Sequence, residues 1–175
     1  MPFNTATLNL IKSFESLHDG DLKQVGLQPK LDPIGIWTEG YGRAMIDLRT
    51  KQFLKGSKNE AYANSIRTIK TEAEAVTALA EDLVKYGNIA KNTLTEVYWN
   101  KLNENQQGAL TSFVYNCGTG KPPYKIFENI RKYLSYLMPE NKLVEYWESS
   151  VIKGGGKVLN GLVRRRKAEA QLFIS

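Results

Sequence analysis

The sequence predicts an α+β protein in which a small β-sheet lobe and a larger helical lobe are joined by one long helix. Apolar residues recur at helical spacing through most of the chain, which indicates amphipathic helices. Glycines and prolines interrupt residues 20–56, where strand-forming side chains such as Ile34, Trp37 and Tyr41 gather. Because ligands bind preferentially in clefts, we expect the functional site between the two lobes.

The length and composition indicate a folded domain. The chain has 175 residues, of which 42% are hydrophobic and 24% charged, and this balance excludes wholesale disorder. We expect 1–175 to form a single domain, with the sheet lobe at about 18–70. The helical lobe is expected at about 92–175 together with the N-terminal helix.

Several classes of site are excluded by residue counts. One cysteine, Cys117, cannot form an internal disulfide, and one histidine, His18, is too few for a cysteine/histidine zinc site. We therefore expect no metal and no cofactor. No apolar run reaches the roughly 20 residues that span a bilayer, and Met1–Leu17 lacks the pattern of a signal peptide.

Capping residues and apolar spacing give the helix boundaries. We predict a helix over about 6–17 after a Thr5 cap, a hairpin or three-stranded sheet within 20–56, and a long helix over about 72–91. The pairs Thr71/Glu74 and Asn103/Gln106 have the spacing of capping boxes. The second pair starts a buried helix that ends at 117–118, and further helices follow at 126–137, around 143–147 and from about 162.

The net charge of +6 favours a polyanionic partner, such as nucleic acid, anionic lipid or a bacterial cell wall. Much of the excess lies in the run 164–167, which has the sequence RRRK. Such runs are usually solvated faces, and on an amphipathic helix long basic side chains also cover apolar surface. We therefore expect no nucleic-acid partner.

Two carboxylates are placed for glycoside chemistry. Hydrolysis of a glycosidic bond needs one carboxylic acid to protonate the leaving oxygen and a second carboxylate across the bond. Glu15 lies where the apolar stripe of the first helix ends, and Asp32 opens a turn in the sheet region, so both could face one cleft. The alternative is that Asp32 is an ordinary turn residue before proline and Glu15 a solvated helix end.

Three segments together resemble the phage-type lysozymes, the endolysins of glycoside hydrolase family 24. They bracket nearly the whole chain in the family's order: FE at 14–15 followed by DPIGIWTEGYG at 32–42, LNENQQGALTSFVYNCG at 102–118, and GLVRRRKAE at 161–169. The resemblance implies a lysozyme-like fold with the active-site cleft between the lobes. It also implies that the catalytic residues are Glu15, Asp32 and Thr38.

In this resemblance Glu15 is the general acid, Asp32 stabilises charge or activates water, and Thr38 holds that water. Substrate contacts are expected from Tyr41, Arg43, Tyr115 and Asn116, the last two as an aromatic face and an amide for sugar groups. Tyr115 and Asn116 have an alternative interpretation as a core tyrosine and a helix-capping asparagine.

This chain departs from the family pattern at two places. Sixteen residues, 16–31, separate Glu15 from Asp32, so the hairpin before Asp32 is expected to be enlarged. Arg43 and Glu39 replace residues usual in the family, and we expect Arg43 either to pair with Glu39 or to hold Glu15 in place.

The resemblance implies an inverting muramidase that hydrolyses the β-1,4 bond between N-acetylmuramic acid and N-acetylglucosamine in peptidoglycan. Two alternatives stay open: a lytic transglycosylase, and a non-catalytic peptidoglycan-binding module of the same fold. Peptidoglycan is then the partner of a monomer without stable membrane insertion. The protein would stay in the host bacterial cytoplasm until it is released to the wall.

Overall fold

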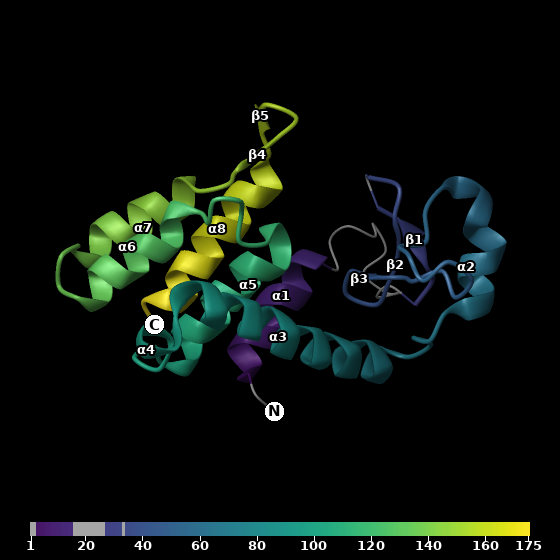
Figure 1. The fold of residues 1–175 in the computed structure, drawn as a ribbon, viewed down its shortest axis with the longest axis horizontal. Helices are drawn as coiled ribbons and strands as arrows, with labels where there is room; N and C mark the ends of the chain where they lie inside the picture. Colours follow the sequence, from purple (N-terminus) through teal and green to yellow (C-terminus); the bar gives the residue numbers. More distant parts are fainter. Residues whose placement is uncertain (1–2, 16–26, 33) are drawn as a thin grey trace. The chain divides into compact units, whose positions relative to one another are not determined.

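The computed structural model of the protein describes residues 3–15, 27–32 and 34–175, and it confirms the α+β class (Figure 1). Its elements, in chain order, are α1 Thr5–Glu15, β1 Lys30–Leu31, β2 Trp37–Glu39, β3 Arg43–Ala44, the 3-10 helix η2 Ser57–Asn59, α2 Glu60–Ile66, α3 Glu72–Leu94, α4 Glu96–Trp99, α5 Glu104–Cys117, α6 Lys125–Leu134, α7 Glu140–Ser149, β4 Lys153–Gly154, β5 Lys157–Val158 and α8 Asn160–Phe173.

The chain divides into two compact units. One contains the described residues of Lys12–Asp82, and the other contains the described residues up to Ile11 together with Leu83–Ser175. Both divisions fall inside helices, within α1 and within the long helix α3. A cleft between the units stays a prediction.

A three-stranded antiparallel sheet organises the unit Lys12–Asp82. Its strand order is β1-β2-β3, with Thr38 of β2 opposite both Lys30 and Ala44. One side of the sheet packs on a small core made by Trp37, Met45, Leu54 and Ala63. The sheet predicted within 20–56 is thereby confirmed for the described residues, while most of the enlarged segment 16–31 lies outside them.

Both predicted capping boxes are present. Glu74 accepts the backbone N–H of Thr71 at 2.9 Å, and the Thr71 hydroxyl accepts the N–H of Glu74 at 3.2 Å, at the start of α3. The reciprocal pair formed by Asn103 and Gln106 starts α5. The cap of α1 differs from the prediction, because the Oδ1 of Asn4 accepts the N–H of Thr7 at 3.0 Å and Thr5 is already helical.

The helical unit is built around α5, which packs against α8, while α7 packs against both α6 and α8 (Figure 1). Every residue of α5 from Gly108 to Val114 is buried. Gly108 meets α1 closely, since a β-carbon there would lie 1.8 Å from the Thr7 hydroxyl. Aromatic rings complete the core, with Trp147 in contact with both Phe113 and Phe173.

Three details of the helical unit differ from the prediction. The helix expected at 126–137 ends at Leu134, before the left-handed Tyr136 with φ 58°. Residues 153–158, for which no strands were predicted, form the hairpin β4-β5. The terminal helix starts at Asn160, two residues before the predicted start.

Candidate active site

Asp32 holds the turn that follows β1. Its Oδ1 accepts the backbone N–H of Ile34 at 2.9 Å and that of Ile36 at 2.7 Å. The side chain is half-buried, and among the described residues these bonds leave its Oδ2 available to a further donor. The turn role expected of an aspartate before proline is therefore real, and it fixes the position of the carboxylate.

The strand register puts Asp32 and Thr38 on the same face of the hairpin. Thr38 lies opposite Lys30. Asp32 lies opposite Ile36, whose carbonyl accepts the Asp32 N–H at 2.8 Å. Because residues two apart on a strand share a face, Asp32 and Thr38 are diagonal neighbours there. The residues on either side of Thr38 are buried against the core, so Thr38 points away from that core.

The Thr38 hydroxyl donates to the carbonyl of Lys30 at 3.2 Å. With its hydrogen used in this way, the hydroxyl oxygen keeps lone pairs that can accept a hydrogen bond. Thr38 is half-buried, which is consistent with contact to a small molecule at the sheet surface.

Glu15 is the last residue of α1, and its side chain is half-buried. Lys12 lies one turn earlier and donates to Glu72 at 3.0 Å. This contact lowers the pKa of Glu72 and, because its effect outweighs burial, raises that of Lys12. The ion pair holds the cation nearest to Glu15 along the helix against another carboxylate.

Tyr41 supports this ion pair from inside the unit. Its ring is 2% exposed, and its hydroxyl donates to Glu72 at 3.3 Å. Burial raises the pKa of the Tyr41 phenol, and the nearby Lys12 opposes that rise. The Tyr41 ring is therefore covered, and contact of Tyr41 with substrate stays a prediction.

Arg43 is bound by α3. Its Nε donates to Asp82 at 2.9 Å, and its Nη2 donates to Glu81 at 2.9 Å and to the carbonyl of Ala78. The expected pairing with Glu39 is wrong, although the two residues are opposite each other in the sheet. The expected hydrogen bond from Arg43 to Glu15 is also wrong, because the Arg43 guanidinium donates to α3 instead.

Glu39 binds the segment before α3 instead of Arg43. Its carboxylate accepts the N–H and hydroxyl of Thr68, both at 2.8 Å, and the N–H of Ile69 at 3.1 Å. Glu39 is buried, and three donors satisfy its charge there.

Tyr115 and Asn116 lie in the last turn of α5, in the helical unit. The Tyr115 ring is edge-on to that of Tyr86, with centroids 4.9 Å apart. The Oδ1 of Asn116 accepts a hydrogen bond from Arg166, and Asn116 lies inside the helix, whose C-cap is Gly118. The capping alternative for Asn116 is therefore wrong. Both side chains are half-buried, and their contact with substrate stays a prediction.

The basic run 164–167 is not a solvated face throughout. Arg165 and Arg166 are 2% and 0% exposed, and both form ion pairs with the fully buried Glu169. Glu169 also accepts from the Ser112 hydroxyl at 2.7 Å. Arg166 in addition lies 4.6 Å from the centroid of the Phe113 ring. The expectation of a solvated charge run is wrong at these two positions, because both guanidinium groups pair with the one buried carboxylate of Glu169.

Cys117 is the neighbour of this cluster and is expected to be inert. Burial raises the pKa of its thiol to about 12, and the Sγ contacts the carbonyl oxygen of Phe113 at 3.1 Å. Cys117→Ala should keep full activity and lower the free energy of unfolding by about 1 kcal/mol, as for a small core truncation. Thermal denaturation and labelling by a thiol reagent check this. Rapid labelling of the folded protein would contradict it.

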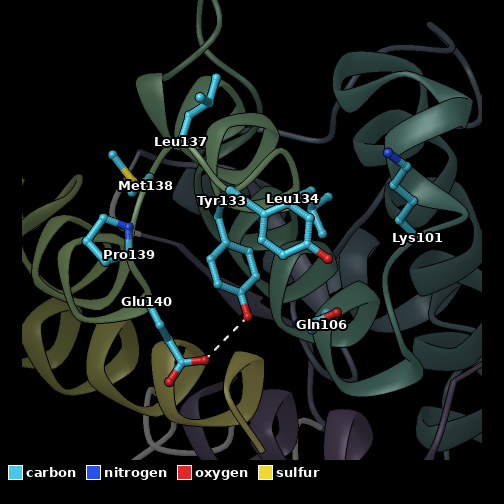
Figure 2. Close-up of a pocket in the computed structure, with 9 residues that line it drawn as sticks. Lys101, Gln106, Tyr133, Leu134, Leu137, Met138, Pro139 and Glu140 are labelled. Atoms are coloured by element: carbon cyan, nitrogen blue, oxygen red, sulfur yellow. Dashed lines mark hydrogen bonds between the residues drawn. The ribbon is translucent and has the colours of Figure 1, made fainter.

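A pocket of about 650 Å³ lies elsewhere in the helical unit (Figure 2). Figure 2 shows Lys101 and Gln106 on one side and Glu140 on the other, with the Tyr133 hydroxyl donating to Glu140 at 3.3 Å. A single carboxylate is not a pair for glycoside cleavage, and none of the predicted site residues lines this pocket.

Within the described residues, no cluster of three or more histidine, cysteine, aspartate or glutamate side chains is arranged to hold a metal ion. In the same part of the chain, no helix combines the length and apolar character of a membrane span.

The phage lysozyme family model matches residues 21–169 of this chain. The endolysin of Bacillus phage B103 is 27% identical over 175 residues, covering 100% of this chain and 55% of the relative. The endolysin of Bacillus phage PZA is 29% identical over 177 residues, covering 100% and 56%. The chain thus spans about half the length of these curated relatives.

Solved structures support the lysozyme-like fold. An endolysin from the Escherichia coli phage FAHEc1 aligns with a TM-score of 0.65 at 23% identity, covering 100% of this chain and 94% of that one. The muramidase domain of SpmX from Asticaccaulis excentricus aligns with a TM-score of 0.59 at 23% identity, covering 99% and 97%. Since the family model covers most of the sequence, this chain belongs to the phage lysozyme family.

Proposed function

We propose that this protein is a muramidase that hydrolyses the β-1,4 bond between N-acetylmuramic acid and N-acetylglucosamine in peptidoglycan. The observation that supports it best is the shared face of Asp32 and Thr38, which puts a carboxylate and a hydroxyl on one surface of the hairpin. Both residues lie inside the segment that matches the phage lysozyme family.

In the proposed mechanism, Glu15 donates its proton to the glycosidic oxygen as the bond to the anomeric carbon breaks. The leaving sugar departs as an alcohol, and positive charge develops on the remaining ring. A water molecule adds to the opposite face of that ring and gives up a proton to Asp32, which balances the reaction.

Asp32 and Thr38 are suited to hold that water, because each can accept one of its two hydrogen bonds. Oδ1 of Asp32 is occupied by backbone N–H groups, so Oδ2 is the oxygen available to accept from water. The Thr38 hydroxyl already donates its hydrogen to the carbonyl of Lys30, so its oxygen is free to accept the second hydrogen of the water. A water that donates both hydrogens directs its lone pairs at the anomeric carbon.

This water-holding role predicts inversion of configuration. A water between the sugar and Asp32 requires the carboxyl groups of Glu15 and Asp32 to be roughly 6.5–9.5 Å apart, whereas direct attack by Asp32 needs roughly 5–5.5 Å. NMR of the first anomer released from a soluble peptidoglycan fragment should show the α product. An initial β product would contradict the role of Thr38 while leaving Glu15 as the acid.

Asp32→Asn separates hydrolysis from the transglycosylase alternative. A neutral amide cannot stabilise developing positive charge or accept the proton of water, so hydrolysis should fall by roughly 10²-fold or more. Thr71→Val, a change at a capping position of α3, serves as a control for a local change of stability. An active Asp32→Asn that releases anhydro sugars would favour the transglycosylase.

The remaining parts of the proposal concern partners and location. The relatives are phage endolysins, and we propose that this protein acts on peptidoglycan as a monomer after release from the host cytoplasm. Its net charge of +6 would favour approach to an anionic wall. The non-catalytic alternative predicts wall binding without any released fragment.

A further inference from the structure

The loop between Ile46 and Phe53 is a well-ordered hairpin in the sheet unit. Ile46 and Phe53 pair as an antiparallel bridge. Above them, the Asp47 N–H donates to the carbonyl of Gln52, and the Lys51 N–H donates to the carbonyl of Asp47, both at 2.8 Å. These bonds hold the tip in one shape, so its side chains are presented as a fixed surface.

This hairpin exposes large apolar side chains. Leu48 is 58% exposed, Phe53 is 53% exposed and Ile46 is 41% exposed. Their neighbours Met45 and Leu54 point to the opposite side and fill the core of the unit. Because alternate residues of a strand point to opposite faces, Ile46 and Phe53 cannot share that core.

A further exposed apolar side chain lies on a turn that is hydrogen-bonded to the end of this segment. Ile34 is 78% exposed, and the carbonyl of the next residue, Gly35, accepts the N–H of Gly56 at 3.0 Å. Groups of exposed large apolar side chains can mark interaction sites in soluble proteins. We call Ile34, Ile46, Leu48 and Phe53 the hairpin patch.

The segment that carries most of the hairpin patch is rich in basic residues. Residues 46–58 contain four basic residues and one acidic residue. The acidic one, Asp47, is neutralised by Arg49, whose Nη2 lies 2.8 Å from its Oδ2. Lys51, Lys55 and Lys58 are exposed, and none forms an ion pair with a described residue. Two of these lysines, Lys51 and Lys55, line one hollow of the surface together with Ile46 and Phe53.

We propose that the hairpin patch docks this protein on the surface of an anionic phospholipid bilayer. Lysine side chains near such a surface are attracted to phosphate headgroups, and apolar side chains that reach the acyl boundary leave water. The combination favours lipid over a soluble polyanion, because a polyanion would recruit the lysines and give no reason for exposed Leu48 and Phe53. Docking is peripheral, and it is independent of the proposed hydrolase activity.

The test uses sedimentation of the full chain with vesicles of phosphatidylcholine, alone or mixed with phosphatidylglycerol. The wild-type protein should sediment with the mixed vesicles and should not sediment with vesicles of phosphatidylcholine alone. Lys51→Glu should weaken binding by about tenfold or more, because it reverses a charge at the surface. Leu48→Ser should weaken binding by about fivefold or more, because it removes an apolar anchor.

Matched controls lie in the helical unit. Lys167→Glu makes the same change of net charge at an exposed position, and Val97→Ser removes an apolar side chain that is 69% exposed. Both controls should bind vesicles as wild type does. Equal loss in the controls and in the hairpin variants would overturn the proposal, as would absence of wild-type binding.

Two further results separate lipid from other partners. Loss of binding in Lys51→Glu with full binding in Leu48→Ser would overturn docking in favour of a purely electrostatic polyanion contact. Leu48→Trp should bind at least as well as wild type, and brominated lipids should quench its fluorescence beyond that of the three native tryptophans. Unquenched fluorescence on bound protein would contradict insertion. Wall hydrolysis, measured in parallel, should be unchanged in every hairpin variant.

Discussion

Glu15→Gln should lose turnover by roughly 10²- to 10⁴-fold, the usual contribution of a general acid. The amide keeps the shape of the side chain and loses the proton that the leaving oxygen needs. Because the change keeps the size of this residue at the end of α1, thermal stability should stay nearly the same. Rate measurements on purified peptidoglycan and a thermal unfolding curve check both parts.

Glu140→Gln is the matched control for Glu15→Gln. It makes the same change at a carboxylate beside the pocket of Figure 2, where the only described partner in that pocket is the Tyr133 hydroxyl. Its turnover should equal that of wild type. Near-normal activity of Glu15→Gln, or equal loss in both variants, would refute the assignment of Glu15 as the acid.

Glu169→Ala is expected to have the largest effect on stability. Glu169 is the shared anion of Arg165 and Arg166, and its removal leaves two buried guanidinium groups without a counter-charge. It also leaves the hydroxyl of Ser112 and the indole N–H of Trp147 without their acceptor. Breaking such a buried pair costs about 3–5 kcal/mol, which corresponds to a fall in melting temperature of roughly 6–20 °C.

Glu145→Ala provides the comparison for an exposed ion pair. Glu145 accepts from Lys142 at 2.8 Å on the surface of α7, and both side chains are well exposed. The free energy of unfolding of the Glu145→Ala variant should differ from that of the wild type by less than about 0.5 kcal/mol. If Glu169→Ala unfolds at the same temperature as Glu145→Ala, the buried cluster contributes little to stability.

Local signals predicted much of the fold. The capping boxes at Thr71 and Asn103 fixed the starts of α3 and α5 correctly, because a cap is formed by residues three positions apart. The hairpin β4-β5 was missed, although the adjacent glycines Gly155 and Gly156 are typical of a two-residue hairpin turn. Their neighbours carry no apolar alternation that would indicate strands.

The candidate site was harder to predict where contacts between distant residues determine the partner of a side chain. Arg43 and Glu39 are near each other in sequence and sheet, yet each finds partners about 30 to 40 residues away, on or just before α3. Arg165 and Arg166 are buried because Glu169 follows them at helical spacing, a pattern visible in the sequence that indicates an ion pair but not its burial. Asp32 and Thr38, by contrast, share a face through strand alternation alone.

The most direct test of the proposed function is mass spectrometry of the muropeptides that the wild-type protein releases from purified peptidoglycan. Hydrolysis between N-acetylmuramic acid and N-acetylglucosamine predicts fragments that end in a reducing N-acetylmuramic acid, each carrying the mass of one added water. Fragments that end in the anhydro sugar would contradict hydrolysis and favour a transglycosylase. An intact wall to which the folded protein is bound would show a non-catalytic module.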